Sequence, residues 1–209
     1  MQGDVFDPED DGRAAYSRGF VPLRSRASAS LTLTPAGTSY GVSLLWLLAA
    51  VTANSRGVSG GHPSVVYGTE NEPAKAALAR SHVLEAFGEV PEQLSLLEGD
   101  LLETLPAADI PDESIDCVLL DIWFVPGLEG VDDVQVLTRG CRAPLALPTL
   151  KILIPKLRVG AVVFIDNTDS SADRYRDLLA ILRSHDSGLI STTLPFSGGF
   201  EMCCFTLGH

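Results

Sequence analysis

Short apolar runs alternate with longer segments of helical spacing along most of this chain. Apolar runs bounded by turn residues predict strands, and longer runs with apolar positions at helical intervals predict helices. The predicted strands are residues 30–34, 64–70, 94–100, 115–121, 161–166, 189–196 and 201–207. The predicted helices are residues 42–53, 72–88, 100–106, 146–157 and 175–185. This alternation is typical of an α/β fold.

The character of the strands indicates how the sheet is assembled. Most strands are continuous apolar runs, as expected for parallel strands that helices cover on both faces. The last two, 189–196 and 201–207, are joined through a Ser-Gly-Gly turn and predict an antiparallel hairpin. We expect an α/β, doubly wound, mostly parallel, seven-stranded sheet with this C-terminal antiparallel hairpin. The segment 42–53 is apolar on most of its surface, which predicts a buried crossover helix.

Two segments do not fit this alternation. Residues 1–27 combine acidic and arginine-containing stretches with few apolar side chains, which predicts a flexible N-terminal arm. Residues 124–144 separate a predicted strand from the next predicted helix and are interpreted as an insertion. Two explanations for it stay open, a lid over a substrate and a translated intron. Residues 28–209 are expected to form one domain, since a single α/β core commonly takes this many residues.

Composition and charge exclude some classes of partner. Hydrophobic residues make up 45% of the 209 residues and charged residues 20%, which is ordinary for a globular protein. Asp and Glu total 27 against 15 Lys and Arg, and the formal net charge of -12 argues against nucleic acid. The longest apolar stretch, residues 42–51, is about half the roughly 20 residues of a membrane span. With no signal-peptide pattern and no disulfide framework among four cysteines, we expect a cytoplasmic protein.

Carboxylates stand where several of the predicted strands end. Glu70, Asp100, Asp121 and Asp166 each close an apolar run, and Asn167 follows the last of them. In a doubly wound sheet, ligands bind beyond the carboxyl ends of the strands. Any one of these residues alone is explained equally well as a helix cap or a turn residue. Their recurrence from strand to strand favours a single ligand site.

A glycine turn, Gly37–Ser43 (GTSYGVS), follows the first predicted strand. It has neither the GxGxxG spacing of dinucleotide sites nor the Lys-Ser/Thr pair of a phosphate loop. A dinucleotide or a triphosphate is therefore disfavoured. Glu70 ends the second strand, where an acid can accept hydrogen bonds from both ribose hydroxyls. An adenosine-type ligand satisfies this pattern without requiring a phosphate.

The order of these pieces resembles the class I S-adenosylmethionine-dependent O-methyltransferases, in particular the small metal-dependent group related to catechol and caffeoyl-coenzyme A O-methyltransferases. The matching stretches are GTSYGVS, YGTENEPAKAALAR, LLEGDLLETL, IDCVLLDIW, LPTLKILIPKLRVGAVVFIDN and LPFSGGFEMCCF. They cover nearly all of the chain from Gly37 to Phe205 and occur in the family's order, which makes the match specific. The resemblance implies the Rossmann-like methyltransferase fold.

The resemblance also implies where S-adenosylmethionine binds. The methionine end of the cofactor would contact the glycine turn, at Gly37, Ser39, Tyr40, Gly41 and Ser43. Glu70 would bind the ribose, Asp100 would lie near the adenine, and Asp121 would border the same pocket.

A divalent cation is part of the same resemblance. Asp121, Asp166 and Asn167 match the residues that coordinate the cation in the family, and they are the expected metal ligands and catalytic residues. Mg²⁺ is the expected ion, because it prefers carboxylate and amide oxygens together with water. A bound cation favours deprotonation of a coordinated hydroxyl, which can then attack the sulfonium methyl.

The chain departs from the family's pattern at two positions. Better known relatives carry a lysine base after the tryptophan that corresponds to Trp123, where this chain has Phe124. Pro35 stands where relatives usually have an acid before the first glycine. Trp123 is interpreted as an apolar wall of the pocket. Lys75 and Arg80 are interpreted as a solvated helix face.

The sequence thus predicts an enzyme that transfers a methyl group from S-adenosylmethionine to a hydroxyl of a small, aromatic acceptor, with divalent-metal assistance. A catalytically impaired, cofactor-binding homologue stays open as an alternative, because of Phe124 and the insertion. A nicotinamide-dependent oxidoreductase, which would share the acid at Glu70, is the third reading. Neither nucleic acid nor a membrane is an expected partner, and a homodimer is left open.

Overall fold

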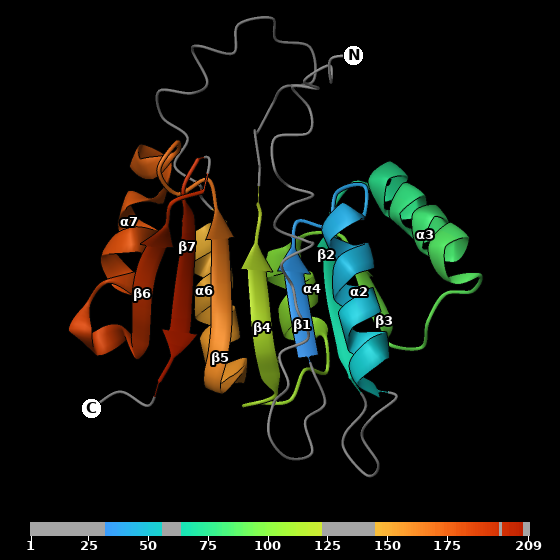
Figure 1. Cartoon of the computed structure of the whole chain (residues 1–209), viewed down its shortest axis with the longest axis horizontal. Helices are drawn as coiled ribbons and strands as arrows, with labels where there is room; N and C mark the ends of the chain where they lie inside the picture. The colour runs from blue at the N-terminus through green and yellow to red at the C-terminus, as the bar shows by residue number, and fades with distance from the viewer. Residues whose placement is uncertain (1–31, 56–63, 123–144, 197, 207–209) are drawn as a thin grey trace, which may run out of the picture.

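A mixed β-sheet runs through the middle of the molecule, with helices on both of its faces (Figure 1). The computed structural model describes residues 32–55, 64–122, 145–196 and 198–206. Within these ranges, hydrogen bonds join seven strands in the order β3-β2-β1-β4-β5-β7-β6. The strands are β1 Thr32–Ala36, β2 Val65–Glu70, β3 Leu94–Glu98, β4 Ile115–Leu120, β5 Leu157–Asp166, β6 Leu189–Leu194 and β7 Phe200–Phe205. The predicted mixed α/β class is confirmed.

The strand directions create a reversal of strand order in the centre of the sheet. The pairs among β1, β2, β3, β4 and β5 are parallel, whereas β7 runs antiparallel to both β5 and β6. From β1 the chain moves outward to β3 and then crosses back to β4, so the strand order reverses between β1 and β4. Doubly wound sheets bind their ligands beyond the carboxyl ends of the strands at such a reversal.

Two groups of helices cover the two faces of the sheet (Figure 1). The helices are α2 Val42–Ser55, α3 Pro73–Phe87, α4 Leu101–Ala107, α6 Ala146–Leu153 and α7 Ala172–Leu182, with short 3₁₀ turns η1 Ile154–Lys156 and η2 His185–Ser187. One apolar core joins α2 and α3 to the sheet, and the other joins α4, α6 and α7 to the opposite face. Burial on both faces explains why the central strands read as apolar runs.

The crossover helix α2 is buried on one face only. Leu44, Leu47 and Leu48 are buried, whereas Val42 is 52% and Trp46 is 42% exposed. The predicted buried crossover helix is therefore buried on its inner face, and the prediction is wrong for the outer face, where Val42 and Trp46 are exposed. Apolar side chains show which positions tolerate burial, but not on which side of the helix the sheet lies.

The boundary between α6 and β5 also differs from the prediction. The helical pattern predicts residues 146–157, but α6 ends at Leu153 and β5 begins at Leu157. Pro155 has no N–H group with which to continue the helical hydrogen bonds. Leu157 instead pairs with Ile115 of β4. The strand is longer than predicted at its start and still ends on Asp166.

The remaining sequence expectations concern the predicted arm and insertion, a membrane crossing and the cysteines. The predicted arm, 1–27, and the predicted insertion, 124–144, lie outside the described residues. Among the described helices, none combines the length and the apolar content that a membrane crossing requires. Cys117 and Cys203 carry free thiols, and burial raises the pKa of each to about 12. Both thiols stay protonated at neutral pH and are poor nucleophiles.

Candidate functional site

A cavity of about 520 Å³ opens at the carboxyl ends of β1, β2, β3 and β4, where the strand order reverses. Its volume lies within the range of small-molecule sites. Five residues of the predicted cofactor site line it, namely Gly37, Ser39, Glu70, Asp100 and Asp121. Segments that are far apart in the sequence therefore meet around one space.

The glycine turn is held between β2 and β4. The Gly37 N–H donates to Thr69 Oγ1 at 3.2 Å, and the Thr38 N–H donates to the Thr69 carbonyl at 2.9 Å. Gly37 has a φ of +94°, and a Cβ added there would lie 2.1 Å from the backbone oxygen of Asp121. Only glycine fits this conformation and this approach. The close contact of the turn with the end of β4 brings Asp121 to the cavity.

The Glu70 carboxylate is fixed by the loops on either side of it. Its Oε2 accepts a hydrogen bond from the Ser39 N–H at 2.7 Å, and its Oε1 accepts one from the Glu72 N–H at 3.0 Å. A carboxylate offers about four acceptor sites, so each oxygen keeps capacity for a ligand hydroxyl. The ribose contact of Glu70 stays a prediction, and this arrangement suits it.

Asp100 caps a helix and also borders the cavity, and its place near the adenine stays a prediction. It is the N-cap of α4, where its side chain accepts a hydrogen bond from the Leu102 N–H at 2.8 Å. It also lines the cavity. The preceding Gly99 N–H donates to the Glu70 carbonyl at 2.9 Å, which fastens the end of β3 to the end of β2.

Three residues of the predicted cofactor set, Tyr40, Gly41 and Ser43, are not among those that line the cavity. Tyr40 is exposed, and the Lys75 ammonium lies 5.8 Å from the centre of its ring. Gly41 packs the turn against α3, because a Cβ added there would lie 3.0 Å from Ala79 Cβ. Ser43 lies in the first turn of α2. Their contact with a cofactor stays a prediction.

Lys75 is a cavity residue that the sequence reading assigned to a solvated face. Arg80, assigned with it, does pair at the surface, with Glu98 at 2.5 Å. Lys75 lines the cavity and pairs with Glu72 at 2.5 Å. Its hydrogen bond to Glu72 raises the pKa of Lys75, so this side chain stays an ammonium at neutral pH and is a poor general base. Its place in the first turn of α3, just after Glu70, could have located it.

A second group of polar residues lies at the ends of β4 and β5. Leu120 and Ile165 are register partners, so Asp121 and Asp166 follow the same rung of neighbouring parallel strands. Such strands lie about 4.8 Å apart. Asp166 is buried, and its Oδ1 accepts a hydrogen bond from the Asn167 N–H at 2.7 Å. The structure thus brings the three predicted metal ligands to adjacent positions.

Tyr175 of α7 belongs to the surroundings of these acids, and the sequence reading missed it. Its side chain is buried, and burial together with the charges of Asp121 and Asp166 raises the pKa of its hydroxyl to about 12. Tyr175 therefore remains a neutral phenol at physiological pH. Nothing in an amphipathic helix distinguishes such a residue from an ordinary core position, so no signal was available in the sequence.

The polar loop after Asp166 is fastened to the turn between β6 and β7. The Thr168 N–H donates to the Gly199 carbonyl at 3.1 Å, and the N–H groups of Asp169 and Ser170 both donate to the Gly198 carbonyl at 2.9 Å. This loop and this turn form one hydrogen-bonded unit. The C-terminal hairpin therefore supports the edge that carries Asp166.

The donor chemistry of Asp121, Asp166 and Asn167 fits a hard cation. Two carboxylates and one amide match the preference of Mg²⁺, which commonly leaves its other positions to water and substrate. The described ranges contain no group of three or more His, Cys, Asp and Glu side chains placed to hold a metal. Metal binding therefore stays a prediction that rests on these three oxygen donors.

The cavity has a predominantly acidic lining. Among the described residues that line it, four carry carboxylates, Glu70, Glu72, Asp100 and Asp121, and one, Lys75, carries an ammonium. A field of this sign favours a cationic ligand and disfavours a phosphate. The predicted pocket wall, Trp123, and the residue in place of the usual base, Phe124, lie outside the described residues.

Comparison with known proteins gives a family for most of this region. A family model described as a methyltransferase domain matches residues 35–168, well over half of the chain. The match includes the glycine turn, the cavity and both groups of acids. It gives no support to the nicotinamide-dependent reading. None of the curated proteins matches the chain.

Solved structures share the fold at low sequence identity. Cofactor-bound Rv0187 from MTB is 20% identical, with a TM-score of 0.63 over 98% of this chain and 83% of that one. The O-methyltransferase TomG from Streptomyces achromogenes, in complex with SAM, is 22% identical, with a TM-score of 0.58 over 86% and 74%. An O-methyltransferase from Bacillus cereus, in complex with SAH, is 18% identical, with a TM-score of 0.61 over 99% and 84%. At these identities the likeness shows a common fold.

Proposed function

Since this chain belongs to the methyltransferase-domain family, we propose that it transfers a methyl group from S-adenosylmethionine to a hydroxyl of a small aromatic acceptor. The observation that carries the proposal is the acidic cavity at the reversal of strand order, with Glu70 fixed between two loops. SAM or SAH is bound in structures that share the fold, among them TomG and the Bacillus cereus enzyme. The acidic lining of the cavity in this chain is complementary to the positive charges of this cofactor.

The lining of the cavity suits the parts of this cofactor. The sulfonium and the ammonium of S-adenosylmethionine are cationic, and the four carboxylates around the cavity favour them. Glu70 is placed to accept hydrogen bonds from the ribose hydroxyls. The missing side chain of Gly37 lets the end of β4 lie against the glycine turn, so Gly37 and Asp121 would together border the methionine end.

Methyl transfer demands position more than side-chain chemistry. The sulfur–methyl bond breaks as the oxygen–methyl bond forms, S-adenosylhomocysteine leaves, and the proton of the acceptor hydroxyl goes to water. Holding the two reactants in line can contribute on the order of 7–11 kcal/mol to lowering the barrier. Lys75 and Tyr175 are both protonated at neutral pH, so among the described residues neither is assigned as the base. Lys75 would act as part of the cavity wall, and Tyr175 as a neutral neighbour of Asp121 and Asp166.

We assign divalent-metal assistance to Asp121, Asp166 and Asn167. These residues would hold Mg²⁺, and the ion would lower the pKa of an acceptor hydroxyl. The chain's own contribution is to keep the two acids on adjacent strands and to orient Asp166 through the Asn167 N–H.

Titration of wild type and Asp166→Ala with S-adenosylmethionine, followed by catechol in the presence and absence of Mg²⁺, tests this assignment. We expect wild type to bind the cofactor and to bind catechol more tightly with Mg²⁺. Asp166→Ala should keep cofactor binding within about twofold and lose the Mg²⁺-dependent part of catechol binding. Asp173→Ala is the matched control, because Asp173 lies in the first turn of α7, the element that follows Asp166, with a side chain that is 94% exposed.

Product analysis separates this function from its main alternative. Phe124 in place of the usual lysine favours an impaired homologue that binds the cofactor without turnover. Methylated catechol formed by wild type and lost in Asp166→Ala supports the enzyme. Cofactor binding without any methylated product from a panel of polyphenols would favour the impaired homologue. Binding of a nicotinamide cofactor in place of S-adenosylmethionine would overturn both.

A further inference from the structure

Three phenylalanines form a continuous row on the sheet beside the polar edge. The rings of Phe164 on β5 and Phe200 on β7 are stacked, with centroids 5.3 Å apart and an interplanar angle of 20°. Phe196, before the β6–β7 turn, meets Phe200 edge to face at 6.1 Å and 82°. Both arrangements are favourable for aromatic pairs. We refer to Phe164, Phe200 and Phe196 as the aromatic row.

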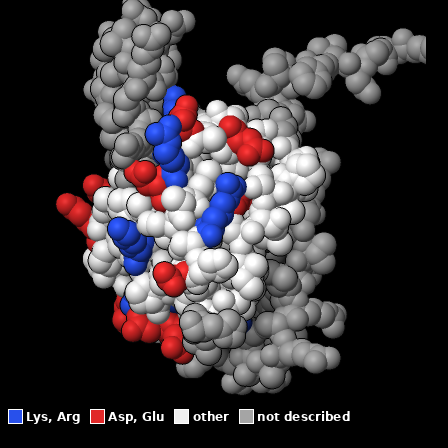
Figure 2. Space-filling view, turned by 90° about the vertical axis from the view of Figure 1, so that its left-hand side faces the viewer, with Lys and Arg blue, Asp and Glu red and all other residues white. Residues whose placement is uncertain are grey.

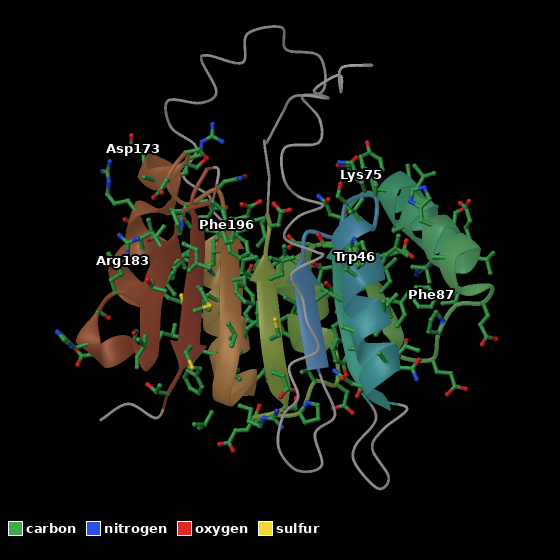
Figure 3. The ribbon with its side chains drawn as sticks, viewed as in Figure 1. Trp46, Lys75, Phe87, Asp173, Arg183 and Phe196 are labelled. Atoms are coloured by element: carbon green, nitrogen blue, oxygen red, sulfur yellow. The ribbon has the colours of Figure 1, made fainter. Side chains whose placement is uncertain are left out.

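The aromatic row leads directly to Asp166. Phe164 and Asp166 are two residues apart on β5, so their side chains point to the same face of the sheet. Phe200 is the register partner of Asp166 on β7. Figure 3 shows Phe196 near the carboxyl end of β5, at the end of the molecule where Lys75 also lies. Apolar rings and the polar groups of the proposed acceptor site are therefore neighbours.

The members of the aromatic row differ in exposure. Phe200 is buried, whereas Phe196 is 50% exposed. The turn that carries Phe196 is closed by the Gly199 N–H, which donates to the Phe196 carbonyl at 2.9 Å. The same turn holds the Asn167–Ser170 loop through its glycine carbonyls. Phe196 thus presents a half-exposed ring whose position is fixed relative to Asp166 and Asn167.

We propose that Phe196 selects aromatic acceptors by packing against the acceptor ring, while the acceptor hydroxyls face Asp166 and Asn167. This inference rests on the proposed function and adds to it the residue that recognises the ring. An aromatic ring continues the row with the geometry already present between Phe196 and Phe200, and it covers apolar area that is now exposed. A saturated ring of the same size lacks the quadrupole that favours such packing and gains less.

The test compares catechol with cyclohexanediol, a saturated ring that carries the same two hydroxyls. Both are titrated into protein loaded with S-adenosylhomocysteine and Mg²⁺, using wild type, Phe196→Ala and Phe196→Leu. We expect Phe196→Ala to weaken catechol binding roughly tenfold and cyclohexanediol binding much less. The catechol affinity of Phe196→Leu should lie between those of wild type and Phe196→Ala, because leucine restores apolar area without the ring. S-adenosylhomocysteine affinity should stay unchanged.

Ile190→Ala serves as the matched control, since Ile190 belongs to the same hairpin, is 68% exposed and is not part of the aromatic row. It should leave both ring compounds unaffected. Equal weakening of the two compounds in Phe196→Ala, or no weakening, overturns the role of Phe196 while leaving the proposed function intact. A wild type that binds the cofactor but neither compound counts against both. The leucine variant keeps the test decisive if the alanine variant does not fold.

Discussion

Gly199 is a single residue on which the polar edge of the site depends. Its φ is +80°, and a Cβ added to it would lie 2.5 Å from both Cγ and the backbone N of Asp169. Real Cβ atoms are not found so close to backbone, so a side chain here must move the neighbouring loop. That loop begins at Asn167, which itself has a φ of +61°. A side chain at Gly199 therefore acts on Asn167 through the loop.

We expect Gly199→Ala to weaken acceptor binding at least about tenfold while cofactor affinity changes little. Gly160→Ala is the control, because Gly160 also has a positive φ, +86°, but no atom lies within 4 Å of the added Cβ. Gly160→Ala should lose about 1 kcal/mol of unfolding free energy from the left-handed backbone, and Gly199→Ala should lose more because its Cβ also displaces the loop at Asp169. Acceptor titration and chemical denaturation give the two quantities. If both glycine variants weakened acceptor binding equally, displacement of the loop would not be the cause of the weakening.

The positions of the individual acids could be predicted from the sequence, but not all of the residues around them. Glu70, Asp121 and Asp166 could be predicted because the end of an apolar run is visible in the sequence and maps to one edge of the sheet. Tyr175 could not, since it is defined by contacts between elements that no local pattern records. Lys75 was assigned to a solvated face, although its position just after Glu70 points to the same edge of the sheet. Local pattern fixes where a residue stands in its own element, and packing decides what it faces.

Among the elements, the C-terminal hairpin contains a buried charge with several partners. Arg183 donates to Glu201 from Nε at 3.2 Å and from a terminal nitrogen at 3.0 Å. Thr193 Oγ1 donates to Glu201 Oε2 at 2.5 Å, and the Ser191 hydroxyl donates to Glu201 Oε1. Acidic and basic side chains are mixed on the end of the molecule that Figure 2 shows. Burial alone would raise the pKa of Glu201, but these hydrogen bonds outweigh it and lower the pKa.

The lowered pKa gives the stability of the hairpin a pH dependence. The ionised Glu201 stabilises the folded state above the pKa of a free glutamate, about 4.3, and this contribution is lost as pH falls through the lower folded-state value. Glu201→Gln should reduce the unfolding free energy by about 2 kcal/mol at pH 7 and flatten its decline in acid. Chemical denaturation between pH 7 and pH 3 measures both effects.

Glu98→Gln is the control for this element, because Glu98 pairs with Arg80 at the surface, where both side chains are 42% exposed. Loss of this surface ion pair should reduce the unfolding free energy by no more than about 1 kcal/mol. A Glu201→Gln variant with the same acid profile as wild type would show that the charge of Glu201 does not matter to folding.

The type and order of the elements could be predicted, whereas some boundaries and faces could not. Each apolar run is long enough to identify its element, and the turn residues separate it from the next. The end of α6 was misplaced because the apolar pattern continues through Pro155 into β5. The outer face of α2 was misjudged because its apolar residues carry no record of where the sheet lies.

For the molecule as a whole, the cavity joins parts of the chain that would otherwise be independent. Its lining comes from the ends of β1, β2, β3 and β4 and from the start of α3 and α4. A ligand bound there contacts all of these segments in the folded state and none of them in this arrangement in the unfolded state. Ligand binding must therefore raise global stability.

We expect S-adenosylmethionine at about 100 times its dissociation constant to raise the unfolding free energy by about 2.7 kcal/mol. The same cofactor concentration should stabilise Glu70→Gln much less, because the acceptor for the ribose hydroxyls is weakened. Glu92→Gln, at an exposed position before β3, should respond as wild type does. Thermal and chemical denaturation with and without the cofactor measure the difference. Equal stabilisation of all three proteins would remove Glu70 from the cofactor site.

The position of β7 has a consequence for the order in which this protein can be completed on the ribosome. β7 lies between β5 and β6, yet it is translated after both of them. While β6 emerges from the exit tunnel, β5 still has one bare edge, and β6 has no strand beside it. An unpaired edge of this kind invites aggregation in nascent chains. The pairing of β7 fills the gap between β5 and β6 and, through the turn at Gly198 and Gly199, fastens the loop after Asp166 at the same moment.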